Sequence, residues 1–223
     1  MEYICRVSVG KEFALLFAVL FLPGMLAQPA GVDAGAFEDL TYHLQILVVS
    51  VPQILLVVAL AGLRRPGSPH RFGWRRPVAA DGLAGAFALV SAWLAVGLIS
   101  LVTGLSGSGD LLDPVVAWSF SRRELIPVAF LSTMAIGYRE EIFFRAYLTD
   151  RAEELGVDAR LALGGGAVLF ALGHLYQGVM GFVVSLAIGL VFAGVYLRSR
   201  SLHGIAVAHG LYNFVVLLAA GSA

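Results

Sequence analysis

Long stretches without a charged residue constrain this chain more than any other feature. Five runs contain no Lys, Arg, Asp or Glu, and they cover residues 13–32, 40–63, 82–109, 161–197 and 201–223. A helix needs about 20 apolar residues to cross the hydrocarbon core of a bilayer. Residues 161–197 are too many for one crossing and enough for two short ones, with a bend expected near Gln177, Gly178 and Gly181. The runs predict an α-helical protein that crosses a membrane several times.

The composition agrees with this interpretation. Hydrophobic residues make up 59% of the 223 residues and charged residues only 13%, whereas about a quarter of an average soluble domain is charged. So few charges cannot cover a water-exposed surface, so we expect much of the surface to face the lipid bilayer. The formal net charge is zero, which gives no general attraction to nucleic acid.

The predicted fold is all-α, a polytopic transmembrane helical bundle of about seven spans (six to eight) in a single integral membrane domain of residues 1–223. A short additional helix within residues 106–121 would raise the count to eight. The apolar residues 13–27 follow Arg6 and Lys11 and so resemble a signal peptide, but we expect them to be retained as the first span. The predicted spans are 12–29, 41–63, 82–105, 123–148, 160–177, 179–198 and 202–220.

Basic residues in the short loops predict the orientation. The loop of residues 64–76 contains five arginines, and two more follow the sixth span. In the loops near residues 28–40 and 106–120, by contrast, all the charged residues are acidic. Short cytoplasmic loops carry an excess of Lys and Arg. We therefore expect the 64–76 loop in the cytoplasm, although Arg122 and Arg123 near the outer end of the fourth span do not follow the rule.

The first candidate for chemistry is a pair of carboxylates at a membrane helix. Glu141 and Arg145 are four residues apart, so on an α-helix they can form an ion pair. Glu140 lies about 100° away around the helix, and is left free to act as a base. It shares a face with Phe143 and Phe144, which would remove water from the carboxylate and make it a better base. The alternative is a helix that reaches the cytoplasmic interface, where charges are ordinary.

Two further spans carry isolated polar groups. His174 follows Phe170 by four residues in an otherwise apolar run, and His209 and Asn213 are also four residues apart, which places each pair on one helix face. Taken singly, a packed histidine or a hydrogen bond between helices explains each case. Together the groups supply a free carboxylate, two histidines and an amide. That inventory is typical of hydrolysis, which needs a base to activate water and donors to hold an oxyanion.

The motifs Glu-Glu-x-x-x-Arg, Phe-x-x-x-His and His-x-x-x-Asn occur in this order on successive spans, and this pattern resembles the CPBP family. That family contains the CAAX prenyl endopeptidases and bacteriocin-processing proteases, and is also called the CAAX amino-terminal protease or abortive-infection family. The resemblance covers about residues 121–220 and implies an intramembrane endopeptidase of the cell membrane. Its substrates would be membrane-embedded or lipid-anchored peptides or proteins.

The resemblance also implies roles for the residues. Glu140 would be the general base, His174 would help to hold the attacking water, and His209 and Asn213 would stabilise the oxyanion. Glu141, Arg145 and Phe170 would support the site.

The sequence leaves the metal question open, because members of the family have been described both as metalloproteases and as metal-independent glutamate proteases. One Glu and two His would suit a catalytic zinc with an open coordination position, and the ligands would then be Glu140, His174 and His209. The chain has no His-Glu-x-x-His motif. We expect no tightly bound metal, with zinc as the alternative.

Two other classes of function also fit the sequence. Glutamate and histidine within a membrane also form proton relays, so a proton-coupled transporter or channel is one alternative. A non-catalytic membrane protein of the bacteriocin-immunity type is the other. The polar residues are expected at one level and not along a path across the membrane, which favours the endopeptidase.

Overall fold

The protein is helical throughout the part that the computed structural model describes, residues 8–27, 35–105 and 120–220, and these residues form no strand. This confirms the all-α prediction. The helices are α1 (Val9–Leu20), α2 (Leu22–Ala27), η3 (Ala36–Glu38), α3 (Leu40–Arg64), α4 (Ser68–Arg71), α5 (Ala79–Leu105), η5 (Arg123–Leu125), α6 (Ile126–Glu141), η6 (Ile142–Tyr147), α7 (Leu148–Leu155), α8 (Ala159–Leu172), η7 (Leu175–Gln177), α9 (Gly178–Ser199) and α10 (Leu202–Ala220). Of these, η6 is a π-helix.

Every predicted span overlaps a helix or a run of consecutive helices, but the count of seven crossings is not confirmed. Four helices of the described residues are long and apolar enough to cross a membrane: α3, α5, α9 with the preceding η7, and α10. The first predicted span is broken at Phe21. Helix α8 has 14 residues, and at 1.5 Å per residue it is about 21 Å long, shorter than the hydrocarbon core of about 30 Å. The additional helix predicted within residues 106–121 falls on residues that are mostly outside the described part of the chain.

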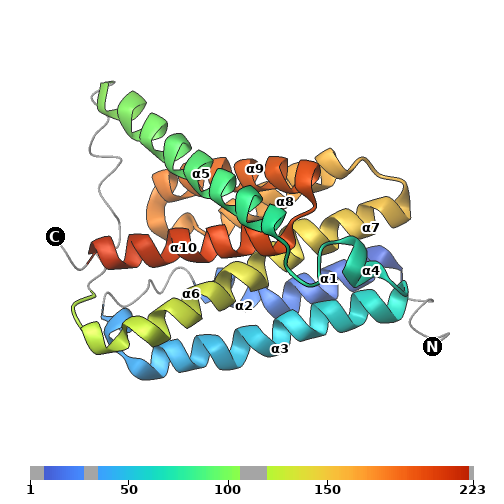
Figure 1. Ribbon diagram of the computed structural model, residues 1–223, viewed down its shortest axis with the longest axis horizontal. Helices are drawn as coiled ribbons and strands as arrows, with labels where there is room; N and C mark the ends of the chain where they lie inside the picture. Colours follow the sequence, from blue (N-terminus) through green and yellow to red (C-terminus); the bar gives the residue numbers. More distant parts are fainter. Residues whose placement is uncertain (1–7, 28–34, 106–119, 221–223) are drawn as a thin grey trace.

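The helices form a bundle in which α6 is central. Helix α10 packs on α6 and on α5, α3 packs on α6, and α9 packs on α8 and α5. In Figure 1, α3, α6 and α10 run along the long axis and α5 crosses them at an angle. Helix α10 thus lies against α6, and α8 contacts η6, which continues α6.

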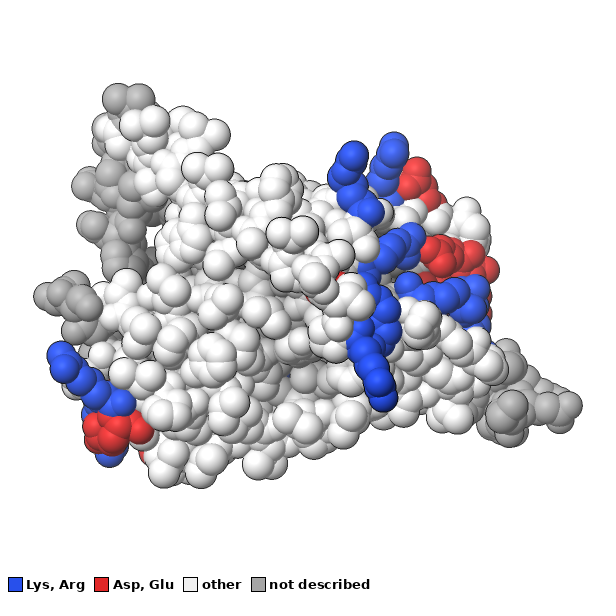
Figure 2. Space-filling model, in the orientation of Figure 1, with Lys and Arg blue, Asp and Glu red and all other residues white. Residues whose placement is uncertain are grey.

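Charged side chains gather toward the two ends of the long axis. Figure 2 shows mainly uncharged atoms between the two groups of coloured residues on this face. Large apolar side chains of α3 and α5, such as Val48, Leu55, Leu83 and Leu94, are exposed. A belt of exposed apolar surface between charged ends matches the environment of a bilayer, and the chain is a multi-pass membrane protein.

Glycine allows α6 and α10 to approach closely. A Cβ atom added at Gly137 would lie 2.6 Å from the carbonyl oxygen of Ala206, and one added at Gly210 would lie 2.5 Å from Cε of Met134. Small residues let membrane helices pack at short distance. This contact brings the end of α6, which carries Glu140, next to the middle of α10, which carries His209.

The first helix is packed into the bundle by aromatic and ionic contacts. The ring of Phe21 lies 4.9 Å from that of Phe143 and 4.7 Å from that of Phe144, between ring centroids. Glu12 is buried and receives Arg64 at 2.9 Å and Arg151 at 3.2 Å. Helix α1, from the stretch that resembles a signal peptide, is therefore part of the folded bundle.

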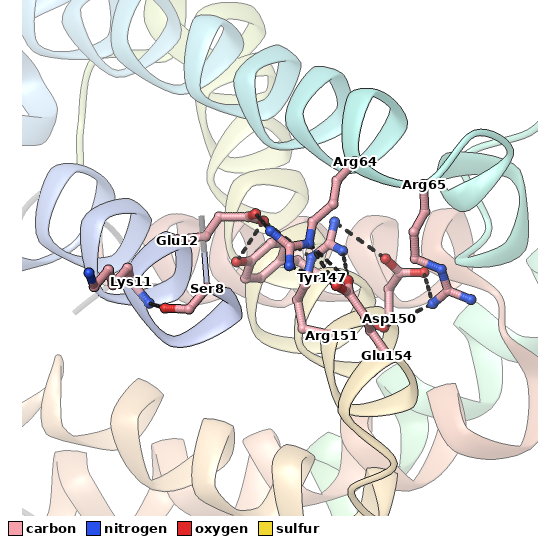
Figure 3. A network of polar contacts seen from close by, with 9 residues as sticks. All are labelled: Ser8, Lys11, Glu12, Arg64, Arg65, Tyr147, Asp150, Arg151 and Glu154. Carbon is pink, nitrogen blue, oxygen red and sulfur yellow. Dashed lines mark hydrogen bonds and ion pairs between the residues drawn. The ribbon is translucent and has the colours of Figure 1, made fainter. Parts of the chain in front are cut away.

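These ion pairs belong to a larger network that joins α1, α3 and α7 (Figure 3). Arg64 also pairs with Glu154 at 2.7 Å, and the hydroxyl of Tyr147 donates to Glu12 at 3.1 Å. Hydrogen bonds from Arg64 lower the pKa of the Glu154 carboxyl below its usual value, so this end of the network stays charged at neutral pH. The network fastens the end of the bundle that carries the arginine-rich loop.

The exception to the basic-loop rule has a local explanation. Arg122 pairs with Glu124 at 2.8 Å and donates to the backbone carbonyl of Glu38 at 3.0 Å. The backbone N–H of Ser121 donates to the carboxylate of Glu38 and lowers its pKa. Because acidic groups surround Arg122, it is a weak topology signal, and the orientation stays a prediction.

We predict that Gly137→Ala destabilises the protein by about 1–3 kcal/mol, because the added methyl group collides with the backbone of α10. Gly165→Ala is the matched control, since a Cβ atom there meets nothing within 4 Å. Thermal unfolding of the purified proteins in detergent measures both. Equal midpoints for the two variants would contradict this account of the contact between α6 and α10.

The orientation is tested by labelling single cysteines in intact cells, with the native Cys5 replaced by serine. His70 and Arg123 are exposed near opposite ends of the bundle. We predict that a membrane-impermeant maleimide labels Arg123→Cys but not His70→Cys until the membrane is opened. Labelling of His70→Cys from outside would reverse the predicted topology.

Candidate active site

The two carboxylates lie where α6 changes into a π-helix. Glu141 ends α6, and Arg145 lies in η6. Their side chains are buried, and Nη1 of Arg145 lies 3.0 Å from Oε1 of Glu141. The predicted ion pair is present, but the backbone that carries it is a π-helix and not the α-helix assumed from the spacing. Such π segments inside α-helices are frequent at functional sites.

Arg145 is held by neighbours from two other helices. Its Nη2 donates to the backbone carbonyl of Gly189 at 3.1 Å, and its guanidinium lies over the ring of Phe170, 5.1 Å from the centroid. A Cβ atom at Gly189 would lie 3.4 Å from Nη2 of Arg145. The cation therefore joins η6 to α8 and α9, and its position fixes that of Glu141.

His209 connects Glu141 with Glu140. Its Nδ1 lies 2.8 Å from Oε1 of Glu141. Because Glu141 is paired with Arg145 and accepts, Nδ1 of His209 donates, which leaves Nε2 facing the site. The imidazole lies between two rings, with centroid distances of 5.6 Å to Phe170 and 5.5 Å to Phe192.

Glu140 is the less tightly held of the two carboxylates. Its Oε1 lies 3.4 Å from Nη2 of Arg139, and its Oε2 lies 3.6 Å from Nε2 of His209. Both distances exceed those of good charge-assisted hydrogen bonds. Phe143 and Phe144 pack on Phe21, and the aromatic surroundings expected for Glu140 stay a prediction. The groups beside Glu140 are ionisable.

His174 lies just after the end of α8. The fifth predicted span, 160–177, is five residues too long at its end, because α8 stops at Leu172 and the chain turns through η7 into α9. Gly178 has a φ of 80° in this turn, close to the predicted bend. Nδ1 of His174 donates to the carbonyl of Phe170 at 2.9 Å, and its ring lies 4.6 Å from that of Phe170. The ring of Phe170 also lies 5.6 Å from that of His209, so Phe170 links His174 to the site.

Asn213 follows His209 by one turn of α10 and is half-buried. Its amide forms no hydrogen bond to another described residue. The side chain is therefore available to a ligand on the face of α10 that carries His209.

The structure brings Glu140, Glu141, Arg145, Phe170, His174 and His209 together, with Asn213 on the same helix as His209. Sequence reasoning did not select Arg139 or Phe192. The signal for Arg139 was present, since it is an arginine beside two glutamates in the middle of a predicted span. Phe192 carries no such signal, because its contact with His209 depends on how α9 packs.

The residues do not fit a preformed metal centre. Within the described ranges, no group of three His, Cys, Asp or Glu side chains is arranged to hold a metal ion. Glu140, His174 and His209, the ligands named for a possible zinc, are not such a group, and metal dependence stays a prediction. The metalloprotease alternative has no support in this geometry.

Comparison with known families supports the resemblance noted from the motifs. Residues 122–215 match the family described as type II CAAX prenyl endopeptidase Rce1-like. This segment is similar to that family. The match includes all three motifs, and at the level of the family it implies a membrane endopeptidase acting on peptide substrates. No curated protein and no solved structure matches the chain.

We predict that Glu141→Gln destabilises the protein by about 3–5 kcal/mol, because it leaves the buried Arg145 without a counter-charge. Arg145→Met in the same chain should restore part of that loss, since it removes the uncompensated cation. Thermal unfolding of the single and double variants measures the effect. A double variant less stable than Glu141→Gln would contradict the proposed dependence of Arg145 on Glu141.

Proposed function

We propose that the protein is an intramembrane endopeptidase of the cell membrane that hydrolyses peptide bonds in membrane-associated or lipidated substrates. The observation that carries this proposal is the contrast between the two glutamates. Glu141 is fully buried and engaged by Arg145 and His209, whereas Glu140 makes only long contacts. Glu140 thus keeps lone pairs for a water molecule.

In the proposed reaction Glu140 takes a proton from water as the water oxygen attacks the scissile carbonyl carbon. His174 supports this step, because Nδ1 carries the proton that bonds the carbonyl of Phe170 and Nε2 of the neutral ring is an acceptor. The two acceptors can orient one water molecule. The proton on Glu140 then passes to the amide nitrogen as the C–N bond breaks, which restores the carboxylate.

His209 and Asn213 stabilise the oxyanion in this proposal. The amide of Asn213 is a donor at any pH. Since Nδ1 of His209 donates to Glu141, Nε2 donates to an oxyanion only when the ring carries both protons. The Glu141 carboxylate holds the ring in place through its 2.8 Å contact with Nδ1. The scheme uses no metal.

The two alternative functions that were considered from the sequence predict different behaviour. A proton-coupled transporter would move ions without cleaving peptides, and a non-catalytic immunity-type protein would do neither. Activity of the purified protein in lipid discs therefore separates the three.

We predict that Glu140→Gln lowers kcat about 10²- to 10⁴-fold toward lipidated model peptides, because the amide cannot accept a proton from water. Its thermal stability and membrane level should stay close to those of the wild type. Glu153→Gln, at an exposed residue paired with Arg200, is the matched control and should keep full activity. Equal activity of Glu140→Gln and wild type, or no cleavage by the wild type, would contradict the proposal.

A further inference from the structure

Arg139 is a cation in the middle of the bundle that the proposed reaction does not use. It lies 13 residues after the start of α6, about 20 Å along the helix at 1.5 Å per residue. The helical run continues for 16 residues beyond it, to the end of α7. A charged side chain at this depth is costly, and such groups face a cavity or a partner.

The partners of Arg139 do not satisfy its guanidinium. Among the described residues its ion-pair partner is Glu140 alone, at 3.4 Å. Its Nε is buried and has no hydrogen-bond acceptor. The guanidinium also lies over the ring of Phe21, 5.8 Å from the centroid. Arginine has five N–H donors, so most of its bonding capacity is available.

The surroundings of Arg139 come from both halves of the chain. Phe21 lies at the break between α1 and α2, whereas Arg139 and Glu140 belong to α6. The ring of Phe21 therefore lies beside the cation that is paired with the proposed base.

We propose that Arg139 is a subsite for a carboxylate of the substrate, close to the scissile bond. The inference rests on the proposed function, since it places the substrate next to Glu140. The planar guanidinium matches a carboxylate better than any other common anionic group of a peptide. Arg139 needs an anionic partner most when Glu140 has accepted a proton, because it then loses its intramolecular counter-charge. The carboxylate is either the C-terminus of the substrate or an Asp or Glu side chain.

The test compares one lipidated peptide in three forms: with a free C-terminal acid, with a C-terminal amide, and as the amide with an Asp near the cleaved bond. We expect wild-type kcat/KM to be about 10- to 100-fold higher for one of the carboxylate forms than for the plain amide. The preferred form identifies the source of the carboxylate. In Arg139→Gln that ratio should fall to within about threefold, whatever the absolute rate.

Two controls keep the result specific. Arg139→Lys retains the charge but loses the planar geometry, so it should keep part of the preference. Arg160→Gln, at an exposed arginine of α8, should leave the ratio at the wild-type value. The proposed subsite would be wrong if the wild type cleaved all three peptides equally, or if the preference for the carboxylate peptide persisted in Arg139→Gln. Either result would leave the proposed endopeptidase function unaffected.

Binding measurements cover the case in which Arg139→Gln does not fold. The cleavage product that carries the carboxylate should inhibit the wild type more strongly than its amide, and Arg139→Lys should reduce that difference. Equal inhibition by acid and amide would overturn the proposal. Absence of any cleavage by the wild type would instead refute the proposed function.

Discussion

The buried carboxylate of Glu141 is the interaction on which the site depends. One of its oxygens receives both Arg145 and His209, so it joins the π-helix to α10. Arg145 in turn reaches the backbone of α9 and the ring of Phe170 on α8. A charge inside a bilayer is tolerated only when it is paired. Four helices are therefore oriented by the need to compensate one ion pair.

This arrangement distinguishes a tightly paired glutamate, Glu141, from a more loosely held one, Glu140. Adjacent residues on a helix point in different directions, so the tight pairing of Glu141 does not extend to Glu140. Glu140 meets Arg139 and His209 at longer distances, which leaves its lone pairs accessible. The close approach of α6 and α10 at Gly137 sets the gap between Glu140 and His209. The site thus combines a rigid support with a carboxylate that can exchange partners.

The N-terminal helices contribute more than membrane anchorage. They lie outside the residues that match the endopeptidase family, yet Phe21 packs on the π-helix and over Arg139. Glu12 compensates Arg64 and Arg151 at the other end of the same helical run. The residues that match the family carry the candidate site, and the preceding helices supply part of its surroundings.

The sequence by itself determined the membrane environment, the all-helical fold and the resemblance of its second half to the endopeptidase family, because charge-free runs and the order of three motifs are local properties of the chain. It also predicted the pair Glu141–Arg145, since i, i+4 spacing brings side chains together even where the backbone widens to a π-helix. Only the tertiary structure decided that α8 ends before His174, that Phe192 contacts His209, and that Arg139 lacks sufficient partners. These features depend on packing between helices far apart in sequence. A residue's partners across such contacts leave no periodic signal in the chain.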